Sequence, residues 1–265
     1  MTTAEFRAVV WRYYRAHGRH DLPWRKTRDP YKILVSEVML QQTQVERVIP
    51  FYAEFTRRFP TVRSLAQAPL SDVLKCWQGL GYNRRAKLLR SAAKILAMRK
   101  IADVSEFEKL PGVGPYTARA IAAFAYDTDV VFIETNIRTA VIHHFFATQE
   151  KISDAEVEKI LKRVLPEGRA REWYSALMDY GARLKRSGNS HNARSNAYAK
   201  QSRFAGSLRE ARGAILRELS KGALPRARLS GLLGVSRRAQ ATRALKALQS
   251  EGLVRAKRGT FSLAD

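Results

Sequence analysis

Two glutamates stand where a carboxyl group could take part in acid–base chemistry, and the first is Glu37. It lies in the middle of an apolar run from Tyr31 to Thr43 that is expected to form a buried helix. Burying a charged carboxylate is costly, so Glu37 should have a raised pKa, be paired, or line a pocket. A carboxylic acid that stays protonated near neutral pH can serve as a general acid. A glutamate on the polar edge of the helix, paired with an arginine, is an equally good interpretation.

The second candidate is Glu134, which follows the apolar residues 130–133 and precedes Asn136. A new helix should start there, and its N–H groups and dipole would stabilise a carboxylate. Glu134 alone is most simply a helix cap, but it could also stabilise a cationic transition state. Two carboxyl groups in such opposite environments can break a glycosidic bond, because one protonates the leaving group while the other supports the sugar cation.

The elements that must position these groups are helices joined by glycine turns, most clearly Leu110–Thr117 (LPGVGPYT). Glycines at 112 and 114 allow backbone conformations that a Cβ would penalise, and Pro115 can start a helix. Backbone N–H groups gathered at a helix N-terminus suit a DNA phosphate. An ordinary helical hairpin is the alternative. The predicted DNA contacts here are Gly112, Val113, Gly114 and Thr117.

If the glycosidic bond belongs to a nucleotide in DNA, that nucleotide must first leave the base stack. Protein residues must then fill the gap that it leaves in the duplex. Two segments at a helix end or turn could insert there, although ordinary helix ends are the alternative. The predicted gap contacts are Gln41, Gln42, Thr43, Leu80 and Tyr82. The basic loop Trp24–Asp29 adds Arg25 as a further DNA contact.

The C-terminal residues show a different pattern. Residues 185–206 read as a basic linker or arm, either solvated or in contact with DNA. Residues 207–265 predict three helices and a β-hairpin, a winged helix-turn-helix with Ser236 capping the third helix. That helix carries Arg237 and Arg238 as predicted DNA contacts, with a protein–protein module as the alternative. The expected fold is therefore an all-α, two-lobed domain over 1–184, a linker, and a small winged helix.

Composition favours a nucleic-acid partner. The chain has 265 residues, a formal net charge of +24 and a single cysteine, Cys76. A polyanion is the expected partner; an anionic membrane is disfavoured because no apolar run approaches the ~18 residues that span a bilayer. One cysteine excludes an intramolecular disulfide and a cysteine-based metal site, and His143–His144 is better explained by packing than by a metal. The N-terminus lacks the apolar region of a signal peptide, so a cytoplasmic, nucleoid-associated location is expected.

Four runs of sequence carry a family resemblance: residues 22–52 (LPWRKTRDPYKILVSEVMLQQTQVERVIPFY), 74–89 (LKCWQGLGYNRRAKLL), 110–126 (LPGVGPYTARAIAAFAY) and 176–182 (ALMDYGA). From residue 22 to about 184 the chain resembles the helix-hairpin-helix DNA glycosylases, specifically the MutY-type adenine glycosylases. The resemblance implies that Glu37 protonates the adenine and that Tyr116 lines the same pocket. Endonuclease III-type relatives carry a lysine at that place, so tyrosine implies a monofunctional enzyme that removes the base without cutting the strand.

The chain departs from this family in three ways. Glu134 stands where the family has an essential aspartate, next to Asn136, which matches the asparagine that orients it. The four cysteines that bind an iron–sulfur cluster in most relatives are missing, so no cofactor is expected. A winged helix replaces the Nudix-like domain that recognises 8-oxoguanine, which leaves that selectivity open.

The resemblance thus implies a monomeric repair enzyme acting on duplex DNA at adenine opposite guanine or 8-oxoguanine. A mismatch thymine or uracil glycosylase and a non-catalytic DNA binder or lesion sensor remain the alternatives.

Overall fold

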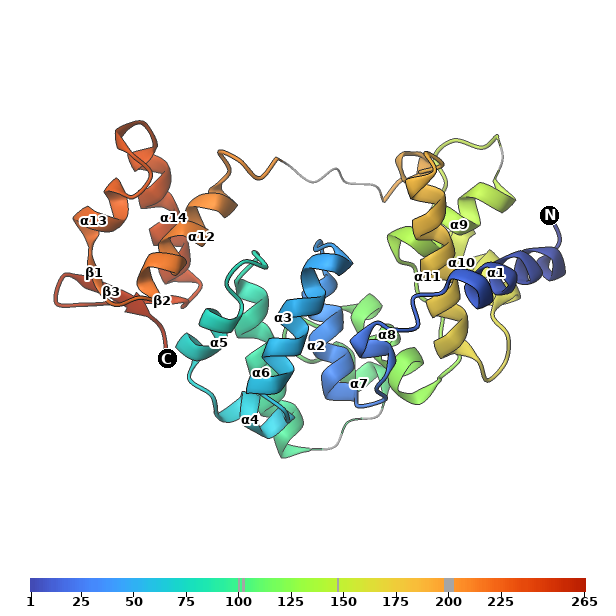
Figure 1. Cartoon of the computed structure of the whole chain (residues 1–265), viewed down its shortest axis with the longest axis horizontal. Helices are drawn as coiled ribbons and strands as arrows, with labels where there is room; N and C mark the ends of the chain where they lie inside the picture. The colour runs from blue at the N-terminus through green and yellow to red at the C-terminus, as the bar shows by residue number, and fades with distance from the viewer. Residues whose placement is uncertain (100, 102, 147, 198–202) are drawn as a thin grey trace. The chain divides into compact units, whose positions relative to one another are not determined.

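The computed structural model describes residues 1–99, 101, 103–146, 148–197 and 203–265 (Figure 1). The chain packs as two compact units. The first holds the described residues within 1–37, 102–109 and 113–200, and the second those within 38–101, 110–112 and 201–265. No helix among the described residues combines the length and the apolar composition needed to cross a membrane.

The first unit is helical. Its helices are α1 (Thr3–His17), the N-terminal part of α2 (Pro30–Leu40), α7 (Val104–Glu108), α8 (Pro115–Tyr126), α9 (Thr135–Phe145), α10 (Asp154–Val164) and α11 (Ala170–Arg186), with 3₁₀ turns at Pro23–Arg25 and Asn192–Arg194. Ser153 and Glu156 form the capping box that their spacing predicts at the start of α10.

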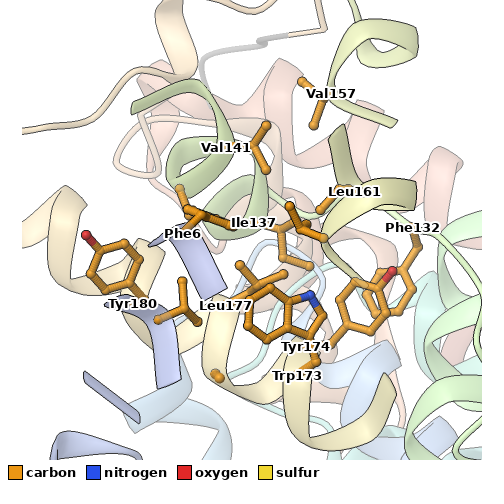
Figure 2. Close-up of a cluster of buried hydrophobic side chains, with 14 of the residues drawn as sticks. Phe6, Phe132, Ile137, Val141, Val157, Leu161, Trp173, Tyr174, Leu177 and Tyr180 are labelled. Carbon is orange, nitrogen blue, oxygen red and sulfur yellow. The ribbon is translucent and has the colours of Figure 1, made fainter. Parts of the chain in front are cut away.

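An aromatic and aliphatic core holds this unit together (Figure 2). Phe132 packs against Tyr174 of α11, with ring centroids 4.0 Å apart. The Tyr174 hydroxyl also donates to the carbonyl of Val130 at 2.8 Å. These contacts hold residues 130–133, which lead into Glu134, against α11. The packing against α11 therefore determines where α9 begins.

Helices α9 and α11 approach closely at Gly181. A Cβ placed on Gly181 would lie 1.9 Å from the carbonyl oxygen of Asn136, a distance at which two atoms cannot coexist. Only glycine therefore allows α11 to pass the first turn of α9.

The second unit contains the C-terminal part of α2, then α3 (Val45–Arg58), α4 (Val62–Gln67), α5 (Leu70–Cys76) and α6 (Arg84–Met98). Its C-terminal elements are α12 (Leu208–Leu219), β1 (Leu224–Pro225), α13 (Arg226–Gly231), a 3₁₀ turn at Val235–Arg237, α14 (Arg238–Ser250), β2 (Val254–Lys257) and β3 (Thr260–Leu263). The three strands form an antiparallel sheet in the order β1-β3-β2. The predicted fold class, a helical body with a small winged helix-turn-helix, is confirmed.

Two details of the winged helix differ from expectation. The strand β1 was not predicted. Ser236 lies inside the 3₁₀ turn, and the residue before α14 is Arg237, which makes no side-chain cap. The predicted Ser236 cap is therefore wrong, because the chain already turns at Gly234, whose φ is +81°.

The winged helix packs against α5 and α6 within the second unit. Lys87 of α6 donates to the carbonyl of Glu251 at 2.6 Å, and Gln78 donates to that of Leu216 at 3.4 Å. The side chain of Ser71 donates to Asp265 at 3.1 Å. The predicted boundaries at 184 and 206 stay predictions, and residues 198–202 of the predicted linker lie outside the described residues.

Candidate active site

The Glu37 side chain is buried and accepts a hydrogen bond from Tyr116. Its side chain lies among apolar neighbours in α2, and the residue is 5% exposed. The hydroxyl of Tyr116 donates to its Oε2 at 2.9 Å. Burial raises the pKa of Glu37 to about 7, the Tyr116 hydrogen bond works against this rise, and the nearby Glu134 adds to it. About half of the Glu37 carboxyl groups are therefore protonated at neutral pH, which suits a general acid.

Tyr116 is held in place by the start of α8. Pro115 occupies the first helical position, as the sequence predicts, and the Tyr116 ring meets Phe132 edge to face at 5.6 Å. Burial and the neighbouring carboxylates raise the pKa of Tyr116 well above its ordinary value. The phenol is consequently neutral, and it serves as a hydrogen-bond donor rather than as a base.

Glu134 is the N-cap of α9, so the cap interpretation of this residue is confirmed. Its Oε2 accepts from the backbone N–H of Asn136 at 2.7 Å, and its Oε1 accepts from the Asn136 side-chain amide at 3.2 Å. The Thr135 hydroxyl donates to the same carboxylate. The structure thus brings Glu37, Tyr116, Glu134 and Asn136 together: an acid with a raised pKa beside a carboxylate fixed by a helix N-terminus.

The glycine hairpin before α8 matches its prediction in part. Gly112 has a φ of +78°, and a Cβ there would meet the Leu88 side chain at 2.8 Å. Gly114 has an ordinary φ of −94° and open space around its Cβ position, so the expectation of a special conformation is wrong for Gly114. Both glycines are exposed, whereas Val113 and Thr117 are buried, so any contact of Val113 with a phosphate must use its backbone.

Comparison with known proteins identifies the family. A family model described as the HhH-GPD superfamily base excision DNA repair protein matches residues 35–167. The adenine DNA glycosylase of Mycolicibacterium smegmatis is 36% identical over a 274-residue alignment that covers 94% of this chain and 92% of that relative. The chain belongs to the HhH-GPD superfamily of base excision DNA repair proteins.

Two further comparisons agree with this assignment. An adenine DNA glycosylase of Buchnera aphidicola is 36% identical over 190 residues, and the chain spans about half (53%) of that relative's length. Among solved structures, a thermostable thymine-DNA glycosylase is 26% identical with a TM-score of 0.60, covering 68% of this chain and 86% of that one.

This HhH-GPD protein organises its predicted gap residues around a buried arginine that the sequence did not single out. From α6, Arg85 Nη1 donates to the carbonyls of Val38 and Gln41 at 2.7 and 2.6 Å. Its Nη2 donates to the Gly81 carbonyl and to the Thr43 hydroxyl, both at 3.3 Å. Burial lowers the pKa of Arg85 to about 10. One guanidinium therefore ties the end of α2 to the Gly79–Tyr82 turn.

Two of the gap residues adopt left-handed backbone conformations. Gln42 has a φ of +54° and Tyr82 one of +46°. Such conformations cost a non-glycine residue about 1–2 kcal/mol and persist only where the surroundings hold them. Tyr82 accepts a 2.8 Å hydrogen bond from Arg209, and the Arg85 and Arg209 guanidiniums lie 5.4 and 5.1 Å from its ring centroid. Leu80, by contrast, is only 5% exposed, so its side chain packs within the protein.

Two predicted DNA contacts have internal partners. Arg25 donates to Asp179 at 2.6 and 3.0 Å, and its side chain is 12% exposed. Although burial alone would raise the pKa of Asp179, hydrogen bonds from Arg25 and Arg19 lower it overall. Arg237 donates to Glu210 and to Gln240 within the winged helix. DNA contacts by Arg25 and Arg237 stay predictions, and the geometry gives both guanidiniums a structural use.

The histidine pair has partners in the first unit. His143 Nδ1 lies 2.9 Å from Nε2 of His191, and His144 Nε2 lies 2.8 Å from the Tyr180 hydroxyl. Burial and the neighbouring His143 lower the pKa of His144 to about 4. Among the described residues, no group of three or more His, Cys, Asp or Glu side chains is arranged to hold a metal ion.

Proposed function

We propose that the protein is a monofunctional DNA N-glycosylase that removes mispaired adenine from duplex DNA. One observation carries this proposal: a buried carboxyl group with a pKa of about 7, bonded to Tyr116 and close enough to Glu134 for their charges to interact. The adenine DNA glycosylases among its relatives support the choice of base.

In the proposed reaction Glu37 donates its proton to a ring nitrogen of the extruded adenine. The electron pair of the N-glycosidic bond then leaves with the base, and the sugar takes on positive charge. Glu134, held through both oxygens by Asn136, stabilises that cation. Water adds to the sugar carbon and loses a proton, which leaves an abasic site.

The side chain at 116 argues for base removal alone. Strand cleavage through a Schiff base needs an amine nucleophile, and the phenol of Tyr116 cannot supply one. Since the pKa of Tyr116 is raised well above its ordinary value, the phenol keeps its proton at neutral pH. Its proposed role is to hold the Glu37 carboxyl toward the base.

We further infer that the enzyme works without an iron–sulfur cluster. Such clusters are held by four thiolates, and the sequence contains one cysteine. The segment after α11 is attached by other means: Ile152 and Arg194 share a backbone hydrogen bond of 2.8 Å, and Asn196 donates to Ile152 at 3.1 Å. The net charge of +24 supports duplex DNA as the partner. We propose that the enzyme acts as a monomer and is associated with the nucleoid.

The test uses duplexes with A·G, A·8-oxoguanine, T·G and U·G pairs, each analysed with and without alkali. The expected result is alkali-dependent cleavage at adenine and an intact strand without alkali. Cleavage only at T·G or U·G would overturn the adenine assignment in favour of the thymine or uracil alternative, which the structural similarity to a thymine-DNA glycosylase keeps in view. If none of the duplexes yielded a product, the proposal that the protein is an enzyme would be overturned.

A further inference from the structure

The charges of the winged helix are unevenly distributed. Residues 221–250 contain seven Lys or Arg and no Asp or Glu, and residues 252–264 contain three more cations and no acid. The four acids of the domain are each within 3.0 Å of a cation, as Glu210–Arg237, Glu218–Lys221, Glu251–Arg212 and Asp265–Arg255 pairs. The remaining cations therefore have no acid of the domain to neutralise them.

Three of these remaining cations lie on α14. Arg238, Arg243 and Lys246 are exposed, and among the described residues their charged groups form no hydrogen bond or ion pair. The opposite face of the helix is apolar, with Ala241, Ala244, Leu245 and Leu248 buried. At about 3.6 residues per turn, Lys246 lies between Arg238 and Arg243 around the helix, so the three cations share the broad exposed side of α14.

The β2–β3 hairpin adds a basic tip. Lys257 pairs with Thr260 at the end of the strands, so Arg258 and Gly259 form a two-residue turn. Both turn residues have positive φ, +49° and +77°, which is the conformation of a tight hairpin turn. Lys257 and Arg258 are exposed. The turn geometry thus displays two cations at the end of a short hairpin.

The domain docks to the rest of its unit through a different surface. The contacts with α5 and α6 come from α12, from the Glu251 carbonyl and from the C-terminal Asp265. Within the described part of the second unit, no hydrogen bond or ion pair joins the α14 cations or the hairpin tip to α5 or α6. These contacts therefore leave the basic surface uncovered by α5 and α6.

We propose that this surface (Arg238, Arg243, Lys246, Lys257 and Arg258) is a second duplex-DNA-binding site, separate from the residues that act on the base. Helix α14 enters the major groove and the β2–β3 hairpin contacts the adjacent backbone. The proposal rests on the proposed function only in taking DNA as the polyanion.

B-form DNA fits this surface better than other polyanions do. Its major groove admits an α-helix, whereas the deep, narrow major groove of duplex RNA does not. Val235, the first residue of the 3₁₀ turn before α14, is 83% exposed and offers an apolar contact for a thymine methyl group. Insertion into a membrane surface would need an apolar stripe alongside the cations, and the exposed positions of α14 carry none.

The test compares the full-length parent with Arg238→Ala/Arg243→Ala/Lys246→Ala. The control is Arg12→Ala/Arg15→Ala/Lys159→Ala, which removes the same charge from exposed positions of α1 and α10. Lesion-free duplexes of about one and about three helical turns are titrated by fluorescence anisotropy at several salt concentrations. Lesion-free DNA makes the result independent of base release.

On the long duplex, the α14 variant should lose about 2–3 from the slope of log K against log salt, since each phosphate contact contributes ~0.9. The parent should bind the long duplex more tightly than the short one, and the α14 variant should not. The control variant should keep that length dependence. Arg238→Lys/Arg243→Lys/Lys246→Arg preserves the charges and should behave as the parent, which separates lost contacts from misfolding.

Three results would overturn the proposal. If the α14 variant and the control had the same slope of log K against log salt and the same dependence on duplex length, α14 would not be a DNA-binding site. Binding of a matched RNA duplex with the same affinity and slope would contradict docking in a B-form groove. Loss of binding to phosphatidylserine vesicles in the α14 variant, with DNA binding unchanged, would assign the surface to a membrane.

Discussion

The pH dependence of base release should follow the protonation of Glu37. With a pKa of about 7, the acid form is about nine-tenths populated at pH 6, about half at pH 7 and about a tenth at pH 8. If Glu37 must donate its proton, the single-turnover rate should be nearly flat below pH 6. Above pH 8 it should fall about tenfold per pH unit. Single-turnover conditions isolate the chemical step from product release.

Two variants test whether the fall in rate at alkaline pH, the alkaline limb of the profile, is caused by deprotonation of Glu37. Glu37→Gln removes the proton donor, so the rate should fall by ~10²–10⁴ and lose its dependence on pH between 6 and 9. Tyr116→Phe deletes the hydrogen bond that lowers the Glu37 pKa, so the alkaline limb should move up by about one pH unit. A flat parent profile from pH 6 to 9, or the same alkaline limb in Glu37→Gln, would refute the assignment.

Three further outcomes are expected. Glu134→Gln keeps the side-chain length but removes the charge that supports the sugar cation, so single-turnover base release should fall by about 10² or more; unchanged release would contradict a role in catalysis. Arg85→Leu should lower the free energy of unfolding by ~2–4 kcal/mol, because the carbonyls of Val38 and Gly81 lose their hydrogen-bond donor. Chemical denaturation measures this loss, and a value below about 1 kcal/mol would contradict the inference that Arg85 holds the end of α2 to the Gly79–Tyr82 turn. Gly181→Ala should cost more than about 3 kcal/mol, because its Cβ meets the Asn136 carbonyl; a crystal structure with α9 unmoved would contradict that argument.

The parts of the fold that depend on local signals could be predicted. Pro115 begins α8, Ser153 caps α10 and Glu134 caps α9, because each signal acts within one helical turn. The apolar neighbours of Glu37 favoured its burial no more than a polar-edge position paired with an arginine, and the structure shows that it is buried.

What the sequence did not predict depends on residues far apart in the chain. The strand β1 has two residues and exists only because β3 pairs with it, so it carries no periodicity of its own. Arg85 and Asp179 look like ordinary charged helix residues until the fold brings them to their partners. The role of Leu80 in holding the gap stays a prediction, but the burial of its side chain by the packing of the turn was not predicted. In each case the deciding contact is tertiary.

The burial of Glu37 gives the reaction a proton donor at neutral pH but makes the folded protein less stable at alkaline pH. A carboxyl group whose pKa is raised on folding favours the folded state below its unfolded pKa, and that advantage disappears as the pH passes through the folded pKa. For Glu37 this interval runs from 4.5 to about 7, so above it the native protein is less stable by ~3 kcal/mol than below it. A population of variants selected only for resistance to heat at alkaline pH should therefore lose this glutamate early. Its retention in any lineage would be a sign that selection acts on the reaction rather than on the fold.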